Sequence, residues 1–176
     1  MDKQNDRSMD RRSLLVRGGA VAAGAVGVTV AGVATAAPAL AVAVGLGYTP
    51  ITPYRSYDSR RPGAGGKIAI GTGRNLQVIT DVKGAATEVP VTAKAVTFNL
   101  TITQTEETGY LGVVPFGTTD LSVSTINWVV SGLDLANGGT TKIAGSGDNV
   151  GSILVYCAGT PGALTHFIID VTGYFA

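Results

Sequence analysis

Cysteine, histidine and charge are scarce in this chain of 176 residues. It has one cysteine and one histidine, only 14% of its residues are charged, and its formal net charge is +1. A single cysteine excludes an intramolecular disulfide, and a single histidine excludes a metal site built from several histidines. The small net charge and the lack of a lysine and arginine stripe argue against a basic nucleic-acid-binding face. Apolar residues, at 45%, exclude intrinsic disorder.

The first forty residues have the pattern of an export signal. Arg11 and Arg12 precede a short apolar step, and no charged residue occurs from position 18 to position 54. A basic start, an apolar stretch rich in Gly and Ala, and an Ala-x-Ala end at Ala41 are typical of a secretory signal, and the arginine pair indicates the twin-arginine type. The sequence therefore predicts a signal peptide over 1–41, a short linker over 42–47 and one domain over 48–176 of a secreted or cell-surface protein.

Two alternatives stay open for this leader. Cleavage after Ala43 fits the small-residue pattern nearly as well as cleavage after Ala41. The uncharged stretch is also long enough to be retained as a membrane anchor, although its glycines and Pro38 weaken a spanning helix.

The residue pattern of the rest of the chain predicts short strands separated by turns. Val96, Phe98, Leu100 and Ile102 alternate with polar residues, which predicts a half-buried strand over 96–103. Similar runs occur at 67–71, 76–80, 110–114, 125–130, 151–157 and 165–172, and the run at 125–130 places Ile126, Trp128 and Val130 on one face. Clusters such as Asn137-Gly138-Gly139 and 145–149 are typical of turns. We predict an all-β fold of seven to ten strands, an antiparallel jelly-roll-like β-sandwich with a β-barrel as the alternative.

Both ends of the predicted domain carry distinctive motifs. The first is Tyr48-Thr49-Pro50-Ile51-Thr52-Pro53-Tyr54-Arg55-Ser56-Tyr57-Asp58-Ser59-Arg60, and the last is Asp170-Val171-Thr172-Gly173-Tyr174-Phe175. Between them lie 96–101, 109–117 and 124–128, in that order. Together these segments resemble a β-rich domain of secreted actinobacterial proteins, in which Ser59 is more commonly threonine. The resemblance implies an extracellular accessory domain without catalytic activity.

Four charged residues fall within these end motifs. Asp58 and Arg60 share one face of an extended segment, and Arg55 joins them only if the chain turns. We interpret Arg55, Asp58 and Arg60, with Asp170, as a structural clasp that holds the first segment against the last strand. The alternative is a polar pocket in which a guanidinium grips a sugar or a carboxylate.

The polar face of the strand 96–103 is the leading candidate for binding. Thr97, Asn99 and Thr101 present a flat, uncharged row of hydrogen-bonding groups, which suits a hydroxylated polymer or a second copy of the domain. Asn127 with Trp128 is a further candidate, because an aromatic ring beside an amide can support a sugar if the ring is exposed.

The sequence supports a catalytic or metal-binding function less than it supports the binding face. His166 and Asp170 share one face of a strand and could serve a small secreted hydrolase, but the sequence has no Gly-x-Ser-x-Gly nucleophile elbow. Asp148 and Asn149 offer too few oxygen ligands for calcium, and Cys157 lies on an apolar face as a small buried residue.

We therefore expect a non-enzyme with no metal and no cofactor. Its expected partner is a cell-envelope glycan or a surface protein. The alternatives are a self-assembling surface protein, which would form homo-oligomers, and the small hydrolase.

Overall fold

The computed structural model describes residues 45–176, and the leader with Arg11 and Arg12 lies outside this range. Nine strands and one 3-10 turn follow one another: β1 (Tyr48–Asp58), β2 (Ile68–Ala69), β3 (Gly73–Gln77), β4 (Ala95–Glu106), β5 (Gly109–Pro115), β6 (Ile126–Trp128), β7 (Leu135–Lys142), η1 (Gly147–Asn149), β8 (Ser152–Gly159) and β9 (Leu164–Phe175). Within the described residues, no helix has the length and apolar character needed to cross a membrane.

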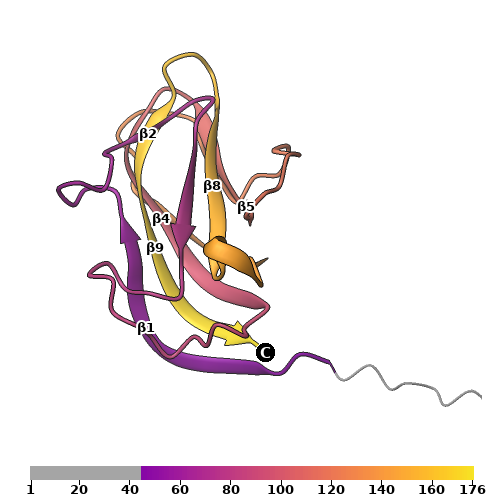
Figure 1. The fold of residues 1–176 in the computed structure, drawn as a ribbon. Coiled ribbons are helices and arrows are strands. Elements are labelled where there is room, and N and C mark those ends of the chain that lie inside the picture. The colour runs from indigo at the N-terminus through magenta and orange to yellow at the C-terminus, as the bar shows by residue number, and fades with distance from the viewer. Residues whose placement is uncertain (1–44) are drawn as a thin grey trace, which may run out of the picture. The chain divides into compact units, whose positions relative to one another are not determined.

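The strands form two antiparallel sheets that face each other (Figure 1). Sheet A has the order β1-β9-β4-β7, with β2 added beside β9, and sheet B has the order β3-β8-β5-β6. The pairs β1–β9, β3–β8, β4–β7 and β5–β6 are nested, first with last, so that the chain passes repeatedly between the sheets. This is the strand order of a jelly roll, and the prediction of a jelly-roll-like sandwich is confirmed. The sheets do not close into the alternative barrel.

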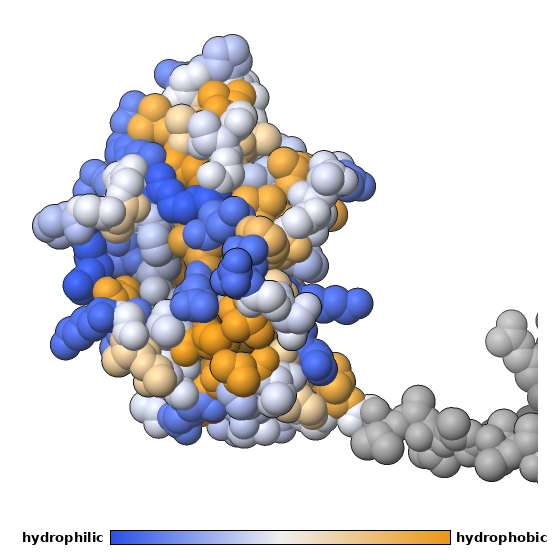
Figure 2. Space-filling view, viewed as in Figure 1, coloured by the Kyte–Doolittle hydropathy of each residue, from blue (hydrophilic) through white to orange (hydrophobic). Residues whose placement is uncertain are grey.

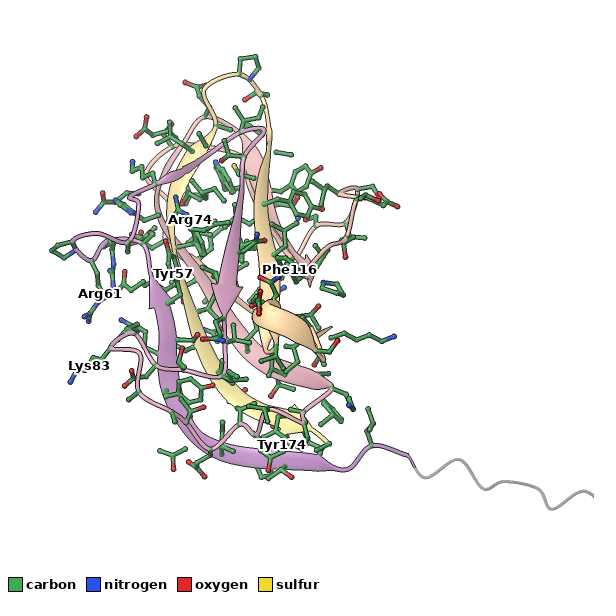
Figure 3. All side chains as sticks on the ribbon, viewed as in Figure 1. Tyr57, Arg61, Arg74, Lys83, Phe116 and Tyr174 are labelled. Atoms are coloured by element: carbon green, nitrogen blue, oxygen red, sulfur yellow. The ribbon has the colours of Figure 1, made fainter. Side chains whose placement is uncertain are left out.

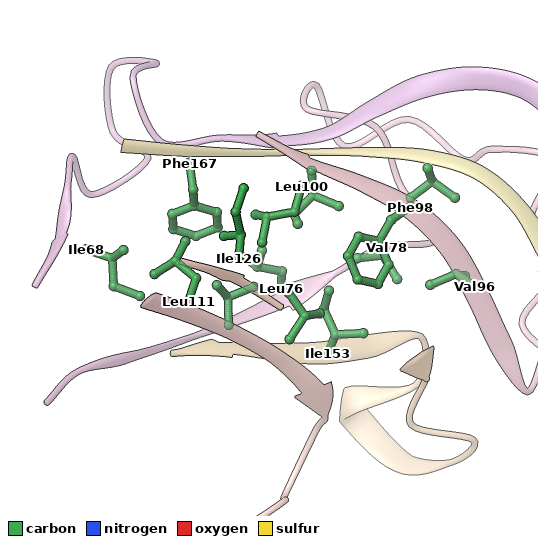
Figure 4. Close-up of a cluster of buried hydrophobic side chains, with 14 of the residues drawn as sticks. Ile68, Leu76, Val78, Val96, Phe98, Leu100, Leu111, Ile126, Ile153 and Phe167 are labelled. Carbon is green, nitrogen blue, oxygen red and sulfur yellow. The ribbon is translucent and has the colours of Figure 1, made fainter. Parts of the chain in front are cut away.

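The core lies between the two sheets (Figure 4). The alternation predicted for 96–103 is confirmed, because Val96, Phe98, Leu100 and Ile102 are all buried and face sheet B. Sheet B contributes Leu111, Ile126 and Ile153 among others to the same cluster. Burying an aliphatic or aromatic side chain contributes about 1.5–3 kcal/mol, so this cluster supplies the main stabilisation of a domain without disulfides.

Two strands, β1 and β7, have no counterpart among the predicted runs. The proline-containing first motif forms the eleven-residue strand β1, an edge strand whose pairing with β9 is interrupted between Pro50 and Tyr54. Edge strands accept proline because one side of the ladder needs no donor. The cluster Asn137-Gly138-Gly139 was predicted as a turn, and this was wrong, since it lies inside β7. Gly139 is required there by packing, because a Cβ would lie 2.7 Å from Cζ of Phe98.

The two ends of the domain lie side by side. Gly47, predicted to be linker, exchanges backbone hydrogen bonds of 3.0 and 3.2 Å with Ala176, and β1 continues this pairing along β9. Tyr48 lies directly over Gly173, where a Cβ would clash with the tyrosine ring. The first and last motifs of the chain are therefore neighbours in sheet A, and Figure 1 shows β1 and β9 curving together.

Candidate functional site

The polar residues of β4 lie on the outer face of sheet A, the side that points away from sheet B. Thr97, Asn99 and Thr101 alternate with the buried residues of the core and are half-buried. Paired residues of antiparallel strands point to the same side of a sheet. Asp170 of β9 is the register partner of both Asn99 and Arg55, so these three side chains form one row across the outer face.

Hydrogen bonds already connect several polar groups of this face. Thr97 Oγ1 lies 3.1 Å from Thr172 Oγ1 and 3.4 Å from the Tyr48 hydroxyl. Asn99 donates from Nδ2 to Thr101 Oγ1 at 3.1 Å. The sequence predicted a flat row of hydrogen-bonding groups here, and the structure shows these groups on an ordered surface whose hydroxyls retain free acceptor capacity.

The four charged residues of the end motifs form one ion-pair network. Arg55 binds Asp170 through two hydrogen bonds, Nε to Oδ1 at 2.8 Å and Nη2 to Oδ2 at 3.2 Å. It also reaches Asp58 from Nη1 at 3.3 Å. Arg60 binds Asp58 at 2.9 Å from Nε and at 2.7 Å from Nη2. The register shift between Arg55 and Tyr57 brings Arg55 to the same side as Asp58, which the periodicity of a regular strand does not provide.

Asp58 is the buried centre of this network. Its side chain is 8% exposed, whereas those of Arg55 and Arg60 are 43% and 42% exposed. The hydrogen bonds from Arg60 lower the pKa of Asp58 from its ordinary value of 3.8 to about 2, against the opposing effect of burial. Asp58 is therefore ionised at every physiological pH.

A shallow hollow of about 380 Å³ opens at the Arg55–Asp170 pair and is lined by these two residues with Pro53 and Tyr54. Asp170 lies beside Asn99 in the neighbouring strand, so the hollow adjoins the amide and hydroxyl row of β4. The arrangement offers a carboxylate, a guanidinium, an amide and hydroxyls along one surface. Such groups can exchange hydrogen bonds with a ligand that carries several hydroxyls.

Trp128 is not part of any exposed site, and this candidate was wrong. Its side chain is 1% exposed, and Nε1 donates to the Glu106 carbonyl at 3.1 Å. The neighbouring Asn127 is exposed, but it belongs to β6 of sheet B. Asn127 therefore does not share a surface with the row on β4.

His166 contacts Ser59 rather than an acid. Its Nδ1 lies 2.9 Å from Ser59 Oγ, and Ser59 Oγ also accepts a hydrogen bond from the backbone of Phe167 at 2.8 Å. Ser59 is 1% exposed, whereas a nucleophile has to reach its substrate. Burial lowers the pKa of His166. Asp170, the other residue of the hydrolase alternative, is bound by Arg55.

The remaining candidates occupy structural positions. Cys157 is buried, and burial raises the pKa of its thiol to about 11. Asp148 and Asn149 lie in the turn η1 and are exposed. Among residues 45–176, no group of three His, Cys, Asp or Glu side chains is placed to hold a metal ion.

Sequence analysis missed Arg74, which fastens the loop after β1. Its guanidinium donates to the Tyr57 hydroxyl at 2.6 Å and to the carbonyls of Gly66 and Gly65 at 3.0 and 3.2 Å. It also lies 5.5 Å from the ring centroid of Phe167. Figure 3 shows Arg74 close to Tyr57, whereas Arg61 and Lys83 extend outward. Hydrophilic residues gather on the side of the domain where Arg61 and Lys83 extend, which is the left side in Figure 2.

The comparisons with known proteins add little. No family model matches the chain, and no curated protein matches it. Among solved structures, the coat protein of Tobacco streak virus is similar with a TM-score of 0.32 and 13% sequence identity, over 76% of this chain and 90% of that one.

Proposed function

We propose that this chain is a secreted, non-catalytic domain that binds a glycan of the cell envelope through the outer face of sheet A. The observation that carries the proposal is the row formed by Arg55, Asp170 and Asn99, which continues into the hydroxyls of β4. The leader supports secretion, and the burial of Ser59 favours binding over hydrolysis. A surface protein in place of the glycan and a small hydrolase stay as alternatives.

The row on β4 gives the direct test of binding. We expect the triple variant Thr97→Ala, Asn99→Ala and Thr101→Ala to bind isolated actinobacterial cell envelope more weakly than the parent, because three sets of hydrogen-bonding groups are lost together. Each substitution should lower the free energy of unfolding by about 1 kcal/mol or less, as expected for a half-buried hydrogen bond. Envelope cosedimentation measures binding, and circular dichroism monitors the fold.

The matched control replaces one asparagine and two hydroxyl-bearing residues elsewhere. Asn75 lies on sheet B, and Thr119 and Ser124 lie between β5 and β6; all three are exposed. The variant with alanine at these three positions should bind as the parent does. If the β4 variant stays folded and binds as tightly as this control, the outer face is not the binding surface. Hydrolysis of glycosidic or ester bonds in the envelope by the parent, detected as released sugar or as released acid, would support the hydrolase instead.

Export gives a separate test of the leader. Replacing Arg11 and Arg12 with lysine should stop the protein from reaching the medium, because the twin-arginine route recognises the guanidinium pair. Immunoblots of cells and medium measure the distribution. Unchanged secretion of the double variant, with loss only when the general secretory route is blocked, would exclude twin-arginine export.

A further inference from the structure

The edge strand β7 exposes backbone hydrogen-bonding groups along its length. Its ladder with β4 has no register shift, and Ile143 just beyond it donates to the Lys94 carbonyl. Backbone groups alternate in direction along an antiparallel strand. Odd-numbered residues of β7 therefore bond β4, and Ala136, Gly138, Thr140 and Lys142 direct their backbone N–H and C=O groups away from the sheet. All four residues are exposed.

The other three edge strands, β1, β3 and β6, are shorter than β7 or are interrupted. β3 has five residues, and its Gln77 carbonyl accepts a hydrogen bond from Ser56 Oγ at 3.3 Å. β1 contains prolines and register shifts, and Val82 of the following loop donates to its Arg55 carbonyl. β6 has only three residues. β7 has eight residues with no proline, no bulge and a single charge at its end. Native proteins normally block an edge of this length, because it is a template for pairing with another strand.

The charges that flank β7 are complementary across a two-fold axis. Asp134 immediately precedes the strand and Lys142 ends it, and within residues 45–176 neither has an oppositely charged partner within 4 Å. If two copies pair antiparallel with Gly138 opposite Gly138, Lys142 of each copy lies opposite Asp134 of the other. Ala136 then pairs with Thr140 of the second copy.

We infer that β7 is a dimerisation edge, at which a second copy of this chain continues sheet A in that register. A two-fold axis through paired edge strands runs perpendicular to the sheet and makes the contact self-complementary. The outer faces of both copies then point to the same side. Two rows of Thr97, Asn99 and Thr101 would lie on one continuous surface, so that a long polymer could bind both and gain avidity. The dimer itself does not require the glycan.

A charge swap tests this register. Sedimentation equilibrium of the full chain without glycan should show a monomer–dimer equilibrium in the micromolar range. Asp134→Lys alone and Lys142→Glu alone should each weaken dimerisation about tenfold or more, because two attractive pairs become two repulsive pairs. The double variant Asp134→Lys with Lys142→Glu should restore the parental affinity. A parent that stays monomeric at about 100 μM overturns the inference, as do single swaps that leave the affinity unchanged.

A second variant tests the backbone edge independently of charge. Gly138→Pro removes an outward N–H, and the bonds with β4 stay intact. A Cβ at this position meets only the Phe98 carbonyl oxygen, at an ordinary contact distance of 3.9 Å. We expect a folded monomer by circular dichroism and sedimentation. A Gly138→Pro protein that still dimerises like the parent would overturn the inference, whereas failure of the glycan-binding test would leave it standing.

Discussion

Replacing Asp58 with alanine is expected to lower the free energy of unfolding by about 2–3 kcal/mol. A pKa lowered from 3.8 to about 2 corresponds to about 2 kcal/mol of stabilisation of the ionised form. Removing the carboxylate also leaves Arg55 and Arg60 facing each other, which adds to the cost. Because both guanidinium groups are partly exposed, the loss should stay below the 3–5 kcal/mol typical of a fully buried pair. Urea denaturation at neutral pH measures the change.

The same residue makes stability depend on pH in a defined window. The folded pKa of Asp58 lies below the unfolded value, so its contribution is complete above about pH 4 and is lost as the pH falls toward 2. An Asp58→Asn variant lacks this contribution at every pH. The difference in stability between the parent and Asp58→Asn should therefore shrink across this acid range.

Asp148→Asn is the matched control, because Asp148 is exposed in the turn η1. Its stability should follow the parent at every pH. Arg60→Ala should cost less than Asp58→Ala, and the double variant should cost less than the sum because the two side chains are bonded to each other. If the costs of Asp58→Ala and Arg60→Ala are additive and small and binding is lost, the network is a recognition pocket rather than a clasp.

Strands in which apolar and polar residues alternate could be predicted from the sequence, because successive side chains of a strand point to opposite faces and only one face enters the core. β4 and β9 carry that pattern, and their predicted runs of eight residues lie within strands of twelve. β7 carries no such pattern, because Gly138 and Gly139 have no side chains to alternate. Glycine is needed at position 139 because the ring of Phe98, about forty residues earlier in the chain, leaves no room for a Cβ. That contact exists only after folding.

The residues of the candidate site could be predicted from the sequence, but their arrangement could not. The polar row of β4 and the end-motif charges are visible in the sequence, but their proximity is not. It depends on the placement of β9 between β1 and β4, and on a register shift that turns Arg55 toward Asp58. The burial of Trp128 could have been predicted, because the alternation at 125–130 already placed it on the face of Ile126. Val130 is exposed in spite of that pattern, since β6 ends at Trp128.

Trp128 is therefore expected to act on stability and not on binding. Its ring packs against Gly109, where a Cβ would lie 2.6 Å from Cζ2, and its indole N–H is bonded to the Glu106 carbonyl. Trp128→Ala should lower the free energy of unfolding by about 3–5 kcal/mol, the range for truncating a large buried aromatic residue.

Asn127→Ala changes the exposed neighbour and should shift stability by no more than about 0.5 kcal/mol. Trp128→Phe keeps most of the buried volume but loses the hydrogen bond. It should therefore lower the free energy of unfolding by more than Asn127→Ala and by less than Trp128→Ala. This folded variant isolates the question of recognition, because its outer face on sheet A is intact. It should cosediment with cell envelope as the parent does. A stable Trp128→Phe protein that no longer binds envelope would place recognition at β6, and the proposed site on sheet A would then be wrong.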